Sequence, residues 1–324
     1  MKQLLLRYGI YLLLAPVVAL LILFQPVFFS PGNLITLITQ SSIIGIVSTG
    51  MTFIILTGGI DLSVGSILYI SGVAAVLTMR ASEMVWLAVV AALLAGGVCG
   101  TINGFSVAKL GLPPMIATLA TTSIARGLGH IIVNGRAILN MPERYTQIGQ
   151  GKLLAWVPIP VLLYAVVFVL AWFVLNKKPF GHFIYAIGNN RDAADASGIQ
   201  TPRVLFCIYL ATGLLCGIGG VVLTSRLGGS QVDLGQGLDF SCITAVALGG
   251  TSLYGGKGRL GGTLAGVFIV GAIENLLRLL NVSVYFYDIV WGIVIFLAVL
   301  IDQSGKKQAE SLEALTEIER GATT

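Results

Sequence analysis

Charged residues are scarce in this sequence. Asp, Glu, Lys and Arg make up 10% of the 324 residues, whereas a soluble globular domain carries roughly 25%. A soluble protein with so few charges could not cover its surface with them. The four cysteines lie inside apolar stretches without the spacing of metal ligands, so we interpret them as small buried apolar side chains and predict no metal site.

A set of catalytic groups is also missing. The only histidines, His130 and His182, are far apart in the sequence, and no H-E-x-x-H, G-x-S-x-G or paired-carboxylate pattern occurs. Residues 256–261, GKGRLG, match G-x-G-x-x-G, but an apolar span follows them and the acidic residue of a dinucleotide site is absent. We therefore expect no cofactor on this chain and no ATP hydrolysis by it. Energy for any transport must come from a partner or an ion gradient.

Apolar residues dominate instead. They make up 56% of the chain and occur in runs of about twenty, the length that crosses a bilayer as a helix. The pattern predicts an all-α polytopic membrane protein with about ten transmembrane helices. The helices are expected at 8–28, 35–56, 63–79, 85–107, 114–133, 157–176, 204–224, 240–250, 262–280 and 285–301. The first run is too long for the apolar region of a signal peptide, so we interpret it as an uncleaved span.

The positions of Lys and Arg indicate the orientation, because cytoplasmic loops carry an excess of them. We expect both termini in the cytoplasm, a transmembrane domain over 1–303 with a long cytoplasmic loop at 177–203, and a cytoplasmic tail over 304–324. The net charge of +5 is not concentrated in a basic run, so nucleic acid is not an expected partner. The cytoplasmic side is predicted to hold Lys2, Arg7, Lys109, Lys177, Lys178, Arg191, Arg203, Lys257, Arg259, Lys306 and Lys307, and the outer side Arg80, Arg136, Arg144, Lys152, Arg226 and Arg278.

Glycine is abundant, with 41 residues, and several glycines recur every four positions within the expected helices. Such a series removes side chains from one helix face, which allows close helix packing; a surface that slides during a conformational change is the alternative. The stretches 55–72 and 247–266 loosely resemble each other, because both pass from a helix end through a glycine-rich break into a new helix. The periodic series are Gly96, Gly100 and Gly104, then Gly213 and Gly217, and finally Gly262 and Gly266.

A polar, alanine-rich segment at 186–200, AIGNNRDAADASGIQ, lies in the longest expected cytoplasmic loop. Asn189 or Asn190 can cap a short helix, Asp192 suits its positive N-terminal end, and Gly198 can end it in the left-handed conformation. A helix of about two turns is unstable alone and must dock on something. Its alanines predict a smooth methyl face that fits a groove on another protein, the alternative being its own bundle.

Four stretches carry a resemblance to a known family. Residues 178–199 resemble the cytoplasmic coupling loop of bacterial ABC sugar-importer permeases, and GIDLSVGS (59–66), GGTSLYGGKGR (249–259) and FLAVLID (296–302) resemble its ribose-type branch. The resemblance covers about 8–303, with Asn189 where the family often has a second glycine. It implies an inner-membrane complex of two permease subunits, two cytoplasmic ATPases that hold ATP and Mg²⁺, and a periplasmic or lipid-anchored sugar-binding protein, with no cofactor on this chain. The implied ATPase-coupling residues are Asn190, Arg191, Asp192, Ala193, Ala194, Asp195, Ala196 and Gly198.

Polar residues within the expected spans are candidates for a translocation path or gate, since a sugar path needs modest polarity. Asp61 lies in the glycine-rich break, where we favour a structural role in holding broken helix ends over a gating or ion-binding role. Interhelical hydrogen bonds are the alternative for the uncharged candidates. These are Gln40, Ser48, Asn103, Thr118, Thr121, Thr122 and Asn275.

Other functions are kept as alternatives. A branched-chain amino-acid or autoinducer-2 permease of the same superfamily is one, and an ion-coupled carrier that uses Asp61 is another; a membrane enzyme lacks catalytic groups. The outer loops 135–155 and 225–239 are expected to meet the binding protein. Their charged residues are Arg136, Glu143, Arg144, Lys152, Arg226, Asp233 and Asp239.

Overall fold

The computed structural model describes residues 26–300 except 154–155, 284–285, 288 and 298–299. Helices make up nearly all the regular structure of this part, as the sequence predicts, and residues 289–297 are also helical. A short antiparallel pair of strands, β1 (Lys152–Leu153) and β2 (Val157–Pro158), is the exception. The helices are η1 (Pro26–Phe29), α2 (Pro31–Leu56), α3 (Val64–Ser82), α4 (Val85–Ala108), α5 (Pro114–Ile132), α6 (Glu143–Gln150), α7 (Ile159–Lys177), α8 (Pro179–Asn189), α9 (Arg191–Ala196), α10 (Thr201–Leu227), α11 (Leu238–Leu248) and α12 (Leu260–Leu279).

Six helices of the described part are long and apolar enough to cross a membrane, namely α2, α3, α4, α7, α10 and α12. They confirm six of the expected spans. The helix expected at 114–133 forms as α5 but is not among those six, and α11 is short, as its apolar run predicts. The span expected at 8–28 lies mostly outside the described residues, and that at 285–301 is described in part, so the number of ten stays a prediction.

Helix ends follow local sequence signals. Ser30 caps α2 by accepting a hydrogen bond from the Asn33 N–H at 3.3 Å, and Pro31 occupies the first turn, where no amide partner is needed. Gly228 ends α10 with φ of 72°, a left-handed conformation that costs glycine little.

The α4 and α10 helices pack through the predicted glycine series. A Cβ on Gly96 would lie 2.2 Å from the Gly213 carbonyl oxygen, and a Cβ on Gly213 would lie 2.3 Å from that of Gly96. The two backbones are therefore in direct contact, which only small residues permit. The packing interpretation of these series is confirmed for this helix pair.

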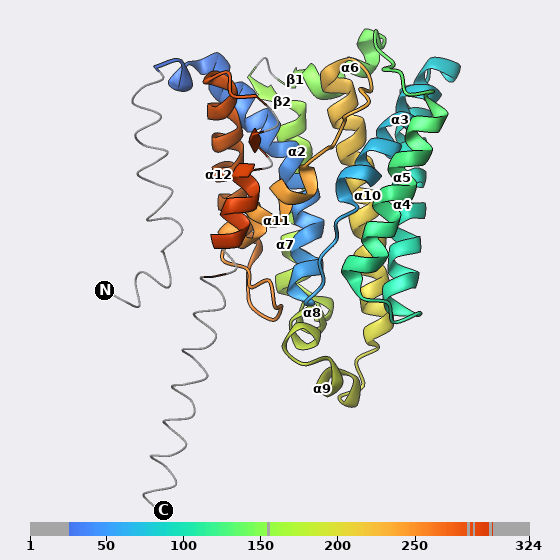
Figure 1. Ribbon diagram of the computed structural model, residues 1–324, viewed down its shortest axis with the longest axis vertical. Helices are drawn as coiled ribbons and strands as arrows, with labels where there is room; N and C mark the ends of the chain where they lie inside the picture. Colours follow the sequence, from blue (N-terminus) through green and yellow to red (C-terminus); the bar gives the residue numbers. More distant parts are fainter. Residues whose placement is uncertain (1–25, 154–155, 284–285, 288, 298–299, 301–324) are drawn as a thin grey trace, which may run out of the picture.

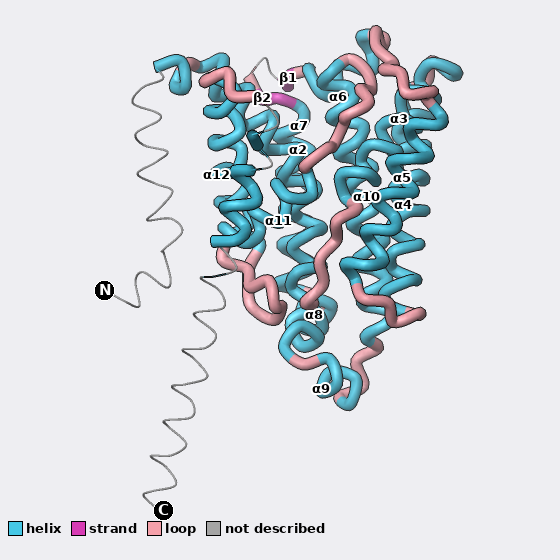
Figure 2. Tube along the Cα trace, in the orientation of Figure 1, coloured by secondary structure: helices cyan, strands magenta, loops and turns pink. Residues whose placement is uncertain are grey.

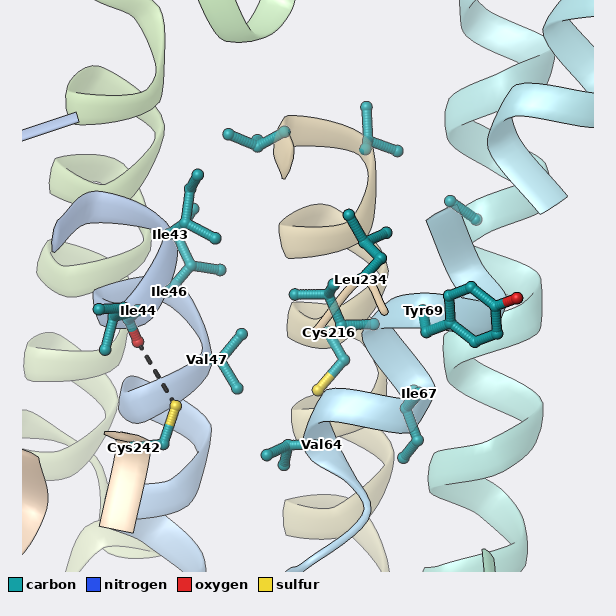
Figure 3. Packing of buried hydrophobic residues seen from close by; sticks show 14 of the residues in the cluster. Ile43, Ile44, Ile46, Val47, Val64, Ile67, Tyr69, Cys216, Leu234 and Cys242 are labelled. Atoms are coloured by element: carbon teal, nitrogen blue, oxygen red, sulfur yellow. Dashed lines mark hydrogen bonds between the residues drawn. The ribbon is translucent and has the colours of Figure 1, made fainter. Parts of the chain in front are cut away.

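The main apolar core joins α2, α3, α10 and α11. Figure 3 shows Val47, Ile67, Cys216 and Cys242 among its members. Each of these four side chains is 1% exposed or less. The expectation of buried cysteines holds for Cys216 and Cys242, but Cys207 is exposed on α10.

The bundle has two distinct ends (Figure 1). The α8 and α9 helices lie at one end, and α6 with the β1–β2 pair lies at the other. Two non-helical segments, 57–63 and 228–237, run along one face between helices, as Figure 2 shows. Irregular backbone at membrane depth must be buried in protein or line a water-filled cavity, so this face bears on function.

Sequence reasoning missed α8 and α6. A signal for α8 was present: Pro179 stands in its first turn, and its buried side chains Ile184 and Ile187 are three residues apart. For α6 the signals were Glu143 in the first turn and the preceding Pro142.

Candidate functional site

The α9 helix occupies the segment in which the sequence predicts a short helix. Asn190 caps it, since its Oδ1 accepts from the Ala193 N–H at 3.0 Å, and Asp192 lies in the first turn. Gly198 has φ of +85°, and the Ile199 N–H donates to the Ala194 carbonyl at 3.1 Å, which closes the C-terminal turn. Both expected caps are confirmed.

The alanines of α9 do not share one face. Ala194 is 3% exposed in an apolar cluster that also contains Ile187 and Leu205, whereas Ala193 and Ala196 are exposed. The expected continuous methyl face is therefore wrong. One methyl group docks α9 on its own bundle, and the others face outward beside the exposed charges of Arg191, Asp192 and Asp195.

Directly before α9, α8 contacts the rest of the bundle at backbone distance. A Cβ on Gly188 would lie 1.8 Å from the carbonyl oxygen of Leu56, the last residue of α2. A Cβ on Gly255 would lie 2.8 Å from the Gly58 nitrogen and 3.1 Å from the Gly188 carbonyl oxygen. We call Gly58, Gly188 and Gly255 the glycine junction. It brings α8 together with both glycine-rich breaks that resemble each other in sequence.

Hydrogen bonds fix the junction. The Gly256 N–H donates to the Leu56 carbonyl at 2.9 Å, and the Tyr185 hydroxyl donates to the Gly258 carbonyl at 2.9 Å. Burial raises the pKa of the Tyr185 hydroxyl above its ordinary value, so it stays protonated and able to donate at neutral pH. The α8 helix is thus bonded to the loop 249–259.

Asp61 lies at the other end of segment 57–63 and is 1% exposed. Its Oδ1 accepts from the Ser63 N–H at 2.7 Å and from the Ser63 hydroxyl at 2.5 Å, just before α3 begins. Asn103 of α4 donates to the Ser63 hydroxyl at 2.8 Å, and Thr121 of α5 donates to Asn103 at 2.6 Å. Asp61 therefore organises the start of α3 and connects it to two neighbouring helices.

Two more path candidates hold the same segment. Thr118 accepts from the Leu62 N–H at 3.2 Å, and Thr122 donates to the Leu62 carbonyl at 2.8 Å. The exposed hydrogen-bonding groups of a broken helix are thereby satisfied inside the bundle. Asp61, Asn103, Thr118, Thr121 and Thr122 thus form one bonded group around the break, and Thr122 also lines a cavity there.

The remaining path candidates lie apart from this group. Asn275 of α12 and Asn33 of α2 exchange two amide hydrogen bonds of 2.8 and 2.9 Å, and Ser48 is fully buried in α2. Gln40 lines a cavity of about 380 Å³ between α2, α10, α11 and α12. With its amide oxygen turned towards α12, Gln40 accepts from the Arg278 guanidinium at 2.8 Å.

The charged residues of the outer loops differ in what lies beside them. Arg144 pairs with Glu83 at 2.6 Å on the surface, where such a pair contributes little stability. Arg226 and Asp233 instead line the 380 Å³ cavity, and Asp239 lines a second cavity beside it. These three residues line the cavities, and Asp233 is also exposed; contact of the outer loops with a binding protein stays a prediction.

The comparisons with known proteins agree with this arrangement. A family model described as the permease component of branched-chain amino acid transport systems matches residues 33–299. The chain is 42% identical to the ribose import permease protein of Bacillus subtilis (strain 168) over 94% of both chains. The chain belongs to this permease family.

Further relatives of the permease are sugar transporters by name. It is 39% identical to the ribose import permease protein of Escherichia coli (strain K12), over 90% of this chain and 91% of the relative. It is 35% identical to an L-arabinose ABC transporter permease protein of Azospirillum brasilense, over 96% and 91%. No solved structure matches the permease.

Proposed function

We propose that the permease is the membrane subunit of an ATP-driven importer that carries a small sugar of the ribose type across the bacterial inner membrane. The observation that carries the proposal is the exposed, doubly capped α9 helix, held by α8 against both glycine-rich breaks. Relatives named for ribose and arabinose transport support the substrate class. The amino-acid and autoinducer-2 alternatives find no such support among these relatives.

The coupling role of α9 is part of this proposal. Ala193 and Ala196 face outward with Asp192, so a groove on a cytoplasmic ATP-binding subunit can receive the helix. ATP and Mg²⁺ would be held by that subunit. Closure of the ATPase pair would push α9 and α8, and the glycine junction would pass the displacement to α2 and to the loop 249–259. The bundle would then alternate between outward- and inward-open cavities.

The other partners follow from the same assembly. The end that carries α6 would receive a periplasmic or lipid-anchored sugar-binding protein, and the α8–α9 end and both termini would be cytoplasmic. A second copy of the permease would cover the face along which segments 57–63 and 228–237 run. Copurification of two differently tagged copies tests this pairing, and recovery of single copies only would contradict it.

An ion-coupled carrier is less well supported. It would need Asp61 as a proton or sodium site, but the Asp61 Oδ1 already accepts two hydrogen bonds from Ser63. Uptake that depends on an ion gradient and needs no ATP would favour the carrier.

The decisive experiment compares tagged wild type with Ala193→Arg, Ala196→Arg and Ala137→Arg variants. Ala137 is exposed at the opposite end, so its variant is a matched control. ATPase activity should copurify with wild type and the control and be lost from the α9 variants, while all chains elute as folded species. Retention of the ATPase by both α9 variants would contradict the coupling role.

A further inference from the structure

The cavity of about 380 Å³ between α2, α10, α11 and α12 has no role in the coupling described above. Its walls come from the parts of these helices that lie away from α8 and α9 (Figure 1). Ile43 and Ile44 lie at its boundary with the apolar core, and Figure 3 shows them above Val47 and Cys242. The core therefore closes the cavity towards the α9 end.

One wall of the cavity is a row of bonded polar groups from three helices. Ser241 of α11 donates to the Glu274 carboxylate of α12 at 2.8 Å, and Arg278 lies one turn beyond Glu274 and contacts Gln40 of α2. The pairing of Glu274 with Arg278 that their spacing allows is not formed. Each of the two charged groups bonds to a neutral partner instead, so it retains hydrogen-bonding capacity for a ligand.

The lining is balanced in charge. Two guanidinium groups, Arg226 and Arg278, and two carboxylates, Asp233 and Glu274, face the same space. Because these charges cancel, the lining offers an anionic ligand no net attraction, and a fully apolar ligand would leave the charges without partners. A neutral molecule with several hydroxyls suits such a lining, because each hydroxyl both donates and accepts.

The remaining lining residues also favour a neutral ligand with several hydroxyls. Tyr287 and Trp291 bring aromatic rings to the cavity, and an aromatic face offers an apolar surface against which the C–H groups of a sugar ring can pack. Ligand pockets usually measure about 300–1,000 Å³, so this cavity is near the lower limit. It has room for a single monosaccharide rather than an oligosaccharide.

We infer that this cavity is a monosaccharide-binding site on the permease, in which Gln40, Glu274 and Arg278 hydrogen-bond to sugar hydroxyls. The inference rests on the proposed function and adds the place where the sugar is held before the core opens towards the α9 end. Substrate choice would then be shared between the binding protein and these three side chains.

Trp291 provides a reporter for the test, because it lines the cavity and is 2% exposed. The purified permease–ATPase complex is titrated with ribose, ribose 5-phosphate or leucine, and the Trp291 signal is taken as the fluorescence difference from a Trp291→Phe complex. Ribose should change this signal saturably and the other two should not. Glu274→Gln and Arg278→Gln should each weaken ribose binding about tenfold, since each removes a charged hydrogen-bonding group.

The control is Arg80→Gln, which removes an exposed arginine from the last turn of α3 and should bind ribose as wild type does. Saturation by leucine or tighter binding of ribose 5-phosphate would overturn the sugar assignment. Equal ribose binding by all variants, or no saturable signal with ribose, would overturn the site. ATP-driven ribose uptake is measured on the same complexes in proteoliposomes to which the sugar-binding protein is added. If wild type takes up ribose but the binding test gives one of these overturning results, only the inferred site is refuted. If wild type takes up no ribose, the proposed function is refuted.

Discussion

Substituting Gly188 by alanine tests whether the glycine junction transmits motion. The added Cβ would lie 1.8 Å from the Leu56 carbonyl oxygen and 2.5 Å from the Gly256 nitrogen. Carbon atoms normally approach other heavy atoms to about 3.5 Å, so α8 would have to move by about 1.7 Å to relieve the 1.8 Å contact. Both contacts are backbone atoms, which cannot rotate away as a side chain can.

Two opposing energies decide the outcome for Gly188→Ala. Alanine favours a helix over glycine by about 0.8–1 kcal/mol, whereas forcing an extra carbon into a packed site costs about 1–3 kcal/mol. Because the contact distance is so short, we expect the cost of the clash to exceed the gain in helix propensity. The α8 helix would then shift away from α2, while α9 keeps its own caps and its outward face.

The matched control is Gly261→Ala. Gly261 lies in the first turn of α12, and a Cβ there would meet nothing within 4 Å. The assay measures copurifying ATPase and the sugar taken up per ATP hydrolysed in proteoliposomes. Gly188→Ala should retain the ATPase but lose most of the uptake per ATP, and Gly261→Ala should match wild type. Equal coupling in the two variants would refute transmission through the junction.

Substitutions at three further positions test the supporting contacts. Asp61→Ala removes both hydrogen bonds to Ser63 and should lower the free energy of unfolding by about 1–3 kcal/mol. Asp61→Asn keeps an acceptor oxygen and should lower the free energy of unfolding less. The reverse order of the two variants in thermal unfolding would contradict the structural role of Asp61. Tyr185→Phe removes one bond and should cost about 0.5–1.5 kcal/mol, measured the same way, with no change expected in ATPase binding. Gly96→Ala forces α4 away from the Gly213 carbonyl and should cost about 1–3 kcal/mol, seen as a lower unfolding temperature in detergent.

The sequence predicts the helices well because their signals are local. Apolar runs of sufficient length give the six spans, and the Asn190 and Gly198 caps of α9 depend only on their immediate neighbours. The outward exposure of Ala193 and the burial of Ala194 could not be predicted in this way. They depend on how α8 turns the chain, and α8 is apolar on one face only, without the length of a span.

For the site residues too, local features are visible in the sequence, whereas contacts between helices are not. That Asp61 lies in a break is visible in the sequence, but its connection to Asn103 and Thr121 depends on the packing of three helices. The cavity was missed for a related reason. Glu274 and Arg278 are four residues apart, which suggests an ion pair within one helix, and only the neighbouring helices show that Ser241 and Gln40 are their partners.

The segment 57–63 joins the glycine junction to the start of α3. At one end, Gly58 contacts Gly255 with no side chain between the two backbones, so little compressible material can absorb a displacement of α8. At the other end, Asp61 and Leu62 are bonded to the start of α3 and to α5. On the proposed coupling role, a displacement at α9 would reach α3 through this non-helical segment, which is held at both ends. Glycine at the first end and a buried carboxylate at the second would then be two parts of one mechanical connection.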